Sequence, residues 1–260
     1  MNLQRRIVTC AALAVAAATA FAQAPDWKKV RIGVEGAYPP FSEVGPDGKL
    51  KGFDIDIALA LCAEMKAECT LVQQEWDGMI PALQARKFDA IIASMAITEE
   101  RKKSVLFSEK YQNTPPWMVG KGSLPHDISP AAMKGKKIGV QRTSIHDRWA
   151  TATYKDSEIV RYSKQDEVFL DLAAGRIDAT VCDSVAANLG FLKTPAGKGF
   201  AVLGTPPDDP AFFGAGAGIA VRKGDAALQQ KFNAAIQAIR ANGTYKKVES
   251  KYFDFDIYGK

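Results

Sequence analysis

Residues 142–146 (RTSIH) lie at a place where the sequence predicts that a helix begins, directly after a β-rich run. The backbone N–H groups of a helix's first turn have no partners within the helix and carry positive potential. Such a loop can accept an anionic group such as a carboxylate, whatever its side chains are. Anion binding is therefore one chemistry that this sequence could support.

Two charged residues could also carry chemistry, although each has an ordinary structural explanation. Arg101 has a planar guanidinium that can engage both oxygens of a carboxylate. It stands in the run Arg101-Lys102-Lys103, which by composition alone favours a solvated helix face. Asp183 follows an apolar run, where an aspartate is usually a turn former. The residue types alone leave both alternatives open.

The sequence gives no sign of catalysis, a metal or a cofactor. The spaced glycines 214, 216 and 218 lack the strand–turn–helix context that a phosphate loop requires. With two histidines in the chain and unsuitable ligand spacing, a metal site is not expected. No Ser-His-Asp arrangement or catalytic cysteine context is evident. We expect a protein that is not an enzyme and binds no cofactor.

Two cysteines are spaced to close a small loop. If the protein is exported to an oxidising compartment, Cys62 and Cys69 could form a disulfide. The alternative is a pair of buried thiols at the end of a helix. Cys182 then remains as a small apolar residue in a strand.

Two short patterns occur twice in the same order, which predicts an internal duplication. Residues 30–34 (VRIGV) resemble 136–140 (KKIGV), and residues 83–92 (LQARKFDAII) resemble 172–181 (LAAGRIDATV). In the second pair, basic residues suit the end of a helix and an Asp-Ala pair enters an apolar strand. Chance likeness between α/β units is the alternative.

Helical patterns fill the segments between these strands. Asp54, Thr98 and Ser163 are each placed to cap a helix. Alternating strands and helices favour mostly parallel sheets flanked by helices, which bind ligands at the carboxyl ends of their strands. The sequence therefore predicts an α/β fold of two lobes with the ligand between them.

Proline-rich segments mark where the chain crosses between the lobes and predict a two-stranded hinge. The chain then resumes with a glycine-rich strand and an amphipathic helix that we expect to return to the first lobe. The predicted boundaries are a signal peptide at 1–22, a first lobe of 23–113 and 215–260, a second lobe of 117–207, and hinge segments at 114–116 and 208–214.

The N-terminal segment has the pattern of a cleaved secretory signal. Arg5 and Arg6 precede an apolar run, and small residues around Ala22 suit cleavage there. Removal of residues 1–22 lowers the net charge from +5 to +3, because that segment holds two arginines and no acids. We expect an exported monomer, and nucleic acid is a poor candidate partner for so mild a charge.

Several motifs closely resemble the cluster-3 periplasmic solute-binding proteins, with similarity along essentially the whole mature chain. The motifs are residues 35–41 (EGAYPPF), 52–58 (GFDIDIA), 76–83 (WDGMIPAL), 94–101 (SMAITEER), 243–245 (GTY) and 251–255 (KYFDF). Within that family the chain is most similar to the branch that binds lysine, arginine, ornithine or histidine, and the paired cysteines match this branch too.

The resemblance implies a two-lobed clamp of type II that closes on one amino acid and docks on the permease of an ABC importer. It assigns the α-carboxylate to Arg101, the α-ammonium to Asp183 and a cationic side chain to Glu35, with Tyr38 and Trp76 around the ligand stem. The full set of ligand-binding residues that we expect is Glu35, Tyr38, Trp76, Ala93, Ser94, Ala96, Arg101, Gln141, Ser144, Ile145, His146 and Asp183.

This sequence departs from the family pattern at the proposed ammonium site. Ala96 stands where close relatives usually carry a serine, and Ala93 replaces another serine or similar small residue. An opine or a neutral polar amino acid is therefore an alternative ligand. A periplasmic dehydratase resembling cyclohexadienyl dehydratase, with Glu35 or His146 as acid or base, is a remote alternative.

Overall fold

The computed structural model describes residues 26–259, so the predicted signal peptide at 1–22 lies outside the described residues. One of its two large sheets has the strand order β5-β1-β6-β13-β7. These strands span Glu68–Gln73 (β5), Lys29–Val34 (β1), Ala90–Ile91 (β6), Ala217–Arg222 (β13) and Val105–Gln112 (β7). Strand β1 is parallel to β5 and β6, and β13 is antiparallel to both its neighbours.

The other large sheet repeats this arrangement with the strand order β10-β9-β11-β8-β12. Its strands span Glu158–Tyr162 (β10), Lys137–Gln141 (β9), Ala179–Asp183 (β11), Pro116–Lys121 (β8) and Phe200–Gly204 (β12). Strand β9 is parallel to β10 and β11, and β8 is the antiparallel member. The prediction of two mostly parallel sheets is confirmed.

The predicted duplication is visible in equivalent hydrogen bonds of the two sheets. Asp89 precedes β6 and accepts from the N–H of Arg31, with an Oδ2–N distance of 3.0 Å. Asp178 precedes β11 and accepts in the same way from Lys137, at 2.8 Å. Each aspartate thus fastens the start of one strand to its parallel neighbour, which explains why the same Asp-Ala pair recurs.

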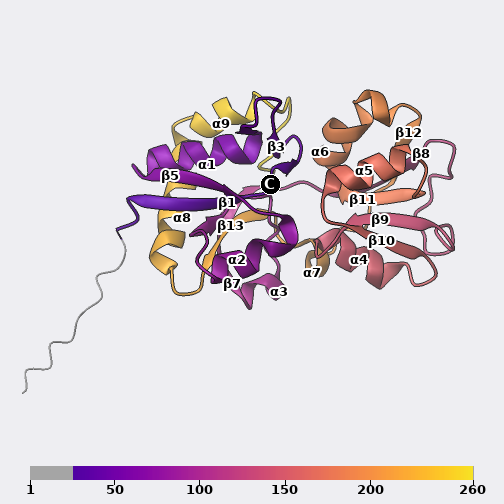
Figure 1. Cartoon of the computed structure of the whole chain (residues 1–260), viewed down its shortest axis with the longest axis horizontal. Helices are drawn as coiled ribbons and strands as arrows, with labels where there is room; N and C mark the ends of the chain where they lie inside the picture. Colours follow the sequence, from indigo (N-terminus) through magenta and orange to yellow (C-terminus); the bar gives the residue numbers. More distant parts are fainter. Residues whose placement is uncertain (1–25, 260) are drawn as a thin grey trace, which may run out of the picture.

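Helices cover both faces of each large sheet, and each sheet forms one lobe together with its helices (Figure 1). In the first lobe, α1, α8 and α9 pack on one face and α2 on the other. In the second lobe, α4 covers one face and α5 the other. The helices span Phe53–Glu64 (α1), Met79–Gln84 (α2), Glu99–Lys102 (α3), Ile145–Thr153 (α4), Gln165–Ala173 (α5), Ser184–Ala187 (α6), Pro210–Phe213 (α7), Ala226–Ala241 (α8) and Thr244–Glu249 (α9).

Helix α8 shows why the C-terminal segment returns to the first lobe. Its buried side chains recur at the spacing of one helical face and comprise Leu228, Phe232, Ala235, Ile236 and Ile239. They join the core that also contains residues of β1 and α1. The beginning and the end of the described chain therefore build one lobe, and its middle builds the other (Figure 1).

Two short connections join the lobes. One runs from the end of β7 at Gln112 to the start of β8 at Pro116, and the other leads from α7 to β13. The segment 208–214, which we expected to act as a hinge, contains α7. This helix contacts α4, and Phe213 joins the core of the second lobe. We therefore propose residues 113–115 and 214–216 as the hinge.

Smaller elements complete the first lobe. A three-stranded sheet has the order β2-β3-β4, with bounds Ala37–Tyr38, Ser42–Val44 and Leu50–Lys51. The disulfide between Cys62 and Cys69 is present, whereas Cys182 is a buried free thiol in β11. The disulfide joins the end of α1 to β5. Within residues 26–259, no helix is long and apolar enough to cross a membrane.

Two of the three predicted helix caps are wrong. The hydroxyl of Thr98 caps α3 by accepting from the N–H of Arg101, as expected. Asp54, however, lies inside the first turn of α1, where Gly52 is the cap residue. Ser163 also misses its expected role, because α5 begins after Lys164 and the Ser163 hydroxyl instead accepts from Arg142.

Candidate functional site

One pocket between the lobes is lined by all twelve residues that the sequence predicted for the site. They are Glu35, Tyr38, Trp76, Ala93, Ser94, Ala96, Arg101, Gln141, Ser144, Ile145, His146 and Asp183. The first seven belong to the first lobe and the last five to the second. These positions lie at or just after the carboxyl ends of β1, β6, β9 and β11, or in adjoining short strands, turns and helices.

Arg101 contributes a positive charge from α3. Its Nη1 donates to the carbonyl oxygen of Ala96 at 3.1 Å, and its guanidinium lies 5.1 Å from the ring centroid of Trp76. Burial lowers the pKa of Arg101 to about 10, and nearby Arg148 acts in the same direction. The group remains charged at neutral pH. In the described part of the chain, no carboxylate forms an ion pair with it.

Asp183 contributes a carboxylate from the end of β11. Its Oδ1 accepts from the N–H groups of Val185 and Ala186, at 2.8 and 3.0 Å, which caps α6. Its Oδ2 accepts from the hydroxyl of Thr114 in the hinge. Burial raises the pKa of Asp183 to about 6, against the lowering effect of these hydrogen bonds. The residue is thus both a helix cap and part of the pocket wall.

Glu35 is a second carboxylate in the pocket wall and is only 5% exposed. Its Oε1 accepts from Gln141 Nε2 of the opposite lobe at 2.5 Å. Burial raises the pKa of Glu35 to about 8, and the Gln141 hydrogen bond lowers it in part. A carboxyl with so high a pKa is poorly compensated when ionised, because its described polar partner is a neutral amide.

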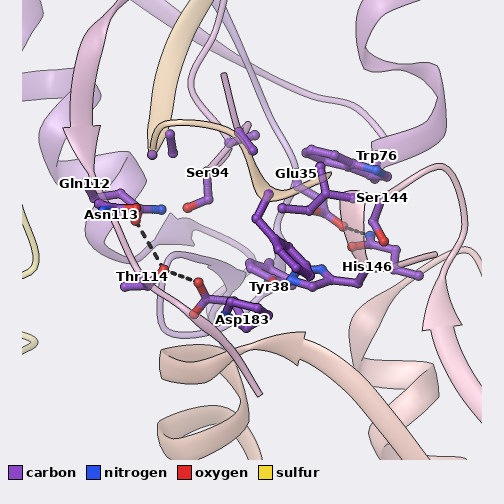
Figure 2. Close-up of a pocket in the computed structure, with 18 of the residues that line it drawn as sticks. Glu35, Tyr38, Trp76, Ser94, Gln112, Asn113, Thr114, Ser144, His146 and Asp183 are labelled. Carbon is purple, nitrogen blue, oxygen red and sulfur yellow. Dashed lines mark hydrogen bonds between the residues drawn. The ribbon is translucent and has the colours of Figure 1, made fainter. Parts of the chain in front are cut away.

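The two predicted aromatic residues lie on different sides of the pocket, with Trp76 above and Tyr38 below in the view of Figure 2. Trp76 belongs to a short 3₁₀ turn at Trp76–Gly78 and faces the Arg101 guanidinium. Tyr38 stacks on Phe41, with ring centroids 5.8 Å apart. Trp76 thus supports the Arg101 guanidinium, and Tyr38 is held in the pocket wall by its contact with Phe41.

The start of α4 faces the pocket with Ser144, Ile145 and His146. Ser144 caps the helix, because its Oγ accepts from the N–H of Asp147 at 3.0 Å. Burial lowers the pKa of His146 to about 3, and the Arg101 charge acts in the same direction. His146 is therefore a neutral imidazole at physiological pH. A helix start with a neutral histidine suits the binding of an anionic group.

Other pocket residues were missed by the sequence analysis. They are Gln112, Asn113, Thr114, Pro116, Phe213, Gly216 and Ala217. All lie at or beside the two connections between the lobes. Such crossing segments must pass the floor of an interlobe pocket, so the proline-rich pattern was the signal that could have found them. Gly214 also packs tightly, since a Cβ there would lie 2.3 Å from the carbonyl oxygen of Ile97.

Three ion pairs at the rim of the pocket join residues of the two lobes. Arg142 Nη1 lies 3.4 Å from Asp77 Oδ2, and Lys164 Nζ lies 3.9 Å from Glu75 Oε1. Arg148 pairs with Glu100 in the same sense. In all three pairs the acid belongs to the first lobe and the base to the second. Together with the bond between Gln141 and Glu35, these contacts describe a closed arrangement.

The chemistry of this pocket is that of a receptor for opposite charges. Across residues 26–259, no group of histidine, cysteine or acidic side chains is arranged to hold a metal ion. The pocket offers one guanidinium, two carboxylates and the start of a helix. A small molecule with both a carboxylate and an ammonium would match this set.

Comparisons with known proteins agree with this chemistry. The sequence profile of the bacterial extracellular solute-binding proteins, family 3, matches residues 30–255. An L-arginine-binding protein of Pseudomonas aeruginosa is 57% identical over 234 residues, covering 89% of this chain and 90% of that protein. The lysine/arginine/ornithine-binding periplasmic protein of Escherichia coli is 42% identical over 245 residues, with 94% of each chain covered.

A solved structure shows the same likeness in three dimensions. It is a periplasmic binding protein of Salmonella typhimurium that is described as having high arginine specificity. The TM-score is 0.80 at 34% sequence identity, and the match covers 86% of this chain and 99% of that one.

Proposed function

The chain belongs to family 3 of the bacterial extracellular solute-binding proteins, and from that premise we propose that it captures a cationic amino acid between its lobes. The protein is periplasmic, and the family resemblance predicted from the sequence is confirmed. Arginine is the first candidate ligand, with lysine, ornithine and histidine next. The partner to which it delivers the ligand is the permease of an ABC importer.

One observation carries this proposal: uncompensated charges of opposite sign face one pocket from opposite lobes. Arg101 lies in the first lobe and Asp183 in the second, and neither has an ion-pair partner among the described residues. An amino acid supplies a carboxylate for Arg101 and an ammonium for Asp183. Because each charge group of the ligand engages a different lobe, binding favours the closed arrangement.

The carboxyl group of Glu35 is the basis for the proposed preference for a ligand with a cationic side chain. Glu35 is buried beside the neutral amide of Gln141, and its raised pKa reflects the cost of ionisation there. A guanidinium or ammonium at the end of the ligand side chain would compensate that charge. Tyr38 would support the ligand stem, and cation–π attraction in a dry site contributes about 1–2 kcal/mol.

We propose a binding protein and not an enzyme, in keeping with the names of its relatives. The dehydratase alternative needs an acid or base beside the substrate. The carboxyl of Glu35 could be protonated at neutral pH, but the ligand's cationic end accounts for its position more directly. Turnover of prephenate or arogenate by the purified protein would overturn this part of the proposal.

A thermal-shift panel on protein freed of bound ligand by unfolding and refolding tests the proposed ligand class. A ligand that binds the folded state alone raises the melting temperature. We expect arginine, lysine, ornithine or histidine to give the largest shift. A larger shift with an opine or with a neutral amino acid such as glutamine would overturn the preference for cations. No shift with any amino acid would overturn the proposed function.

A further inference from the structure

A buried carboxylate lies directly behind the pocket wall, outside the set that the sequence predicted for the site. Asp54, in the first turn of α1, is 1% exposed. No lysine or arginine among residues 26–259 forms an ion pair with it. A buried carboxylate without a cation is costly to retain, and such groups occur preferentially at functional sites.

Asp54 holds one pocket residue by two routes. Its Oδ2 accepts from the Ser94 hydroxyl at 2.9 Å, and its Oδ1 accepts from the Tyr111 hydroxyl at 2.9 Å. The Tyr111 oxygen in turn accepts from the backbone N–H of Ser94 at 2.8 Å. The side chain and the backbone of Ser94 are therefore both fixed. This matters because Ser94 adopts a left-handed backbone conformation, with φ of 48°.

The direction of the first hydrogen bond decides what Ser94 can offer to a ligand. A serine hydroxyl has one proton and two lone pairs. Since the proton goes to Asp54, only lone pairs remain for the pocket. Figure 2 shows Ser94 on the same side of the pocket as Thr114 and Asp183, with Trp76 and Ser144 on the other. On that side an obligatory acceptor suits an ammonium and disfavours a carboxylate.

We propose that Asp54 is a positioning residue for the ligand's α-ammonium: it fixes Ser94 as a hydrogen-bond acceptor for that ammonium. This inference rests on the proposed function. It also accounts for Ala96, which offers no hydroxyl at the place where the family usually has one. Ser94, held by Asp54, supplies the hydrogen-bond acceptor that Ala96 lacks.

The ionisation of Asp54 is consistent with this role. Burial raises the pKa of Asp54 to about 7, the hydrogen bonds from Tyr111 and Ser94 lower it, and the charge of Asp183 raises it further. An ammonium at this end of the pocket would favour the ionised carboxylate. The ligand and the hydrogen-bond arrangement of Ser94 would then stabilise each other.

The test compares L-arginine with 5-guanidinopentanoic acid, which lacks the α-amino group, by calorimetry on the wild type and Asp54→Asn. An asparagine side chain can donate to Ser94, so the hydroxyl is no longer held as an acceptor. We expect arginine affinity to fall about tenfold, while the affinity for the analogue changes less than about twofold. If the ratio of arginine affinity to analogue affinity stays as in the wild type, the role of Asp54 is merely structural and the inference is overturned. This holds whether both affinities fall equally or neither falls.

Asp56→Asn is the matched control. Asp56 lies two residues further along α1 and contacts Lys251 Nζ and the Tyr252 hydroxyl, at 2.8 and 3.0 Å. It does not line the pocket. This variant removes an acid from the same helix, so we expect it to leave the arginine-to-analogue ratio as in the wild type. A tenfold change here would show that general helix charge, not Asp54, sets the ratio.

Ser94→Ala tests the route and keeps the inference testable if Asp54→Asn does not fold. We expect Ser94→Ala to lower the ratio of arginine affinity to analogue affinity. When Asp54→Asn is added to Ser94→Ala, the ratio should change by less than about a further twofold. An unaltered ratio in Ser94→Ala, or a full tenfold loss added by Asp54→Asn, would overturn the route through Ser94. Absence of arginine binding by the wild type would instead contradict the proposed function itself.

Discussion

The amide of Gln141 in the second lobe donates to the carboxylate of Glu35 in the first, with 2.5 Å between Nε2 and Oε1. This hydrogen bond joins the ends of β9 and β1 across the pocket. It gives Glu35 a polar partner but no positive charge. The carboxylate is therefore positioned to receive a cation that comes with the ligand, and several measurable consequences follow from that.

The first prediction concerns Glu35→Gln, which keeps the shape of the side chain and removes its charge. Arginine affinity should fall by about 2–5 kcal/mol, because the ligand's cation would then be buried without a counter-charge. Calorimetry measures the change. Glu43→Gln is the control, since Glu43 lies in β3, pairs with Lys51 and does not line the pocket. Equal arginine affinity in wild type and Glu35→Gln would contradict the assigned role.

Arginine binding should release protons near neutral pH. In the closed pocket without ligand, burial raises the pKa of Glu35 to about 8, so there this carboxyl is mostly protonated at pH 7. A bound cation favours the ionised form and lowers that pKa, and therefore a proton leaves on binding. Affinity should rise with pH below about 8 and level off above it. Calorimetry in buffers with different ionisation enthalpies measures the release, and Glu35→Gln should reduce it. Binding heats that do not depend on the buffer would contradict this account.

Arg101→Lys should weaken arginine binding by about 2 kcal/mol or more, because an ammonium cannot reproduce the planar fork that engages both carboxylate oxygens. Agmatine, which is arginine without the α-carboxylate, supplies the control ligand. Its affinity should change little in this variant. A parallel loss for arginine and agmatine would show that Arg101 acts on the fold of the pocket and not on the carboxylate.

The rim ion pairs should contribute little to affinity. The side chains of Arg142 and Asp77 are 44% and 30% exposed, and such pairs contribute about 0–1 kcal/mol. Arg142→Ala should therefore lower arginine affinity by less than about 1 kcal/mol, with a smaller effect at high salt. Titrations at two ionic strengths check this. A loss comparable to that of Glu35→Gln would mean that the rim, not the pocket, controls closure.

The disulfide should stabilise the fold without affecting the site. Cys62 and Cys69 enclose a short loop at the end of α1, and neither lines the pocket. Replacing both by alanine should lower the free energy of unfolding by about 2–3 kcal/mol in the chain-entropy model. Thermal unfolding and calorimetry measure the two effects. A tenfold loss of arginine affinity would show that the loop also positions the pocket.

The fold was predictable because the same α/β sequence pattern occurs in both halves of the chain. Asp89 and Asp178 make equivalent hydrogen bonds in the two sheets, and the repeated Asp-Ala pair made this visible before any coordinates. Local helix details were less predictable. Leu59 of α1, for example, is 48% exposed, whereas the nearby apolar residues Ile57 and Leu61 are fully buried in the core. A pattern of apolar residues on nearly all sides leaves the orientation of a helix open.

The composition of the pocket could be predicted from motifs, but its hydrogen bonds could not. Every residue expected in the pocket lines it, as do hinge residues that no motif indicated. Asp54 matched a family motif and a helix-cap pattern, and neither revealed that it holds Ser94 from behind. Contacts between residues 40 positions apart depend on packing, which a local pattern does not encode.

A crystal structure of the protein with bound arginine tests the central claim most directly. The account predicts the ligand's α-carboxylate on Arg101, its α-ammonium between Asp183 and Ser94, and its guanidinium on Glu35. A ligand bound outside the interlobe pocket, or one with its α-carboxylate away from Arg101, would contradict it.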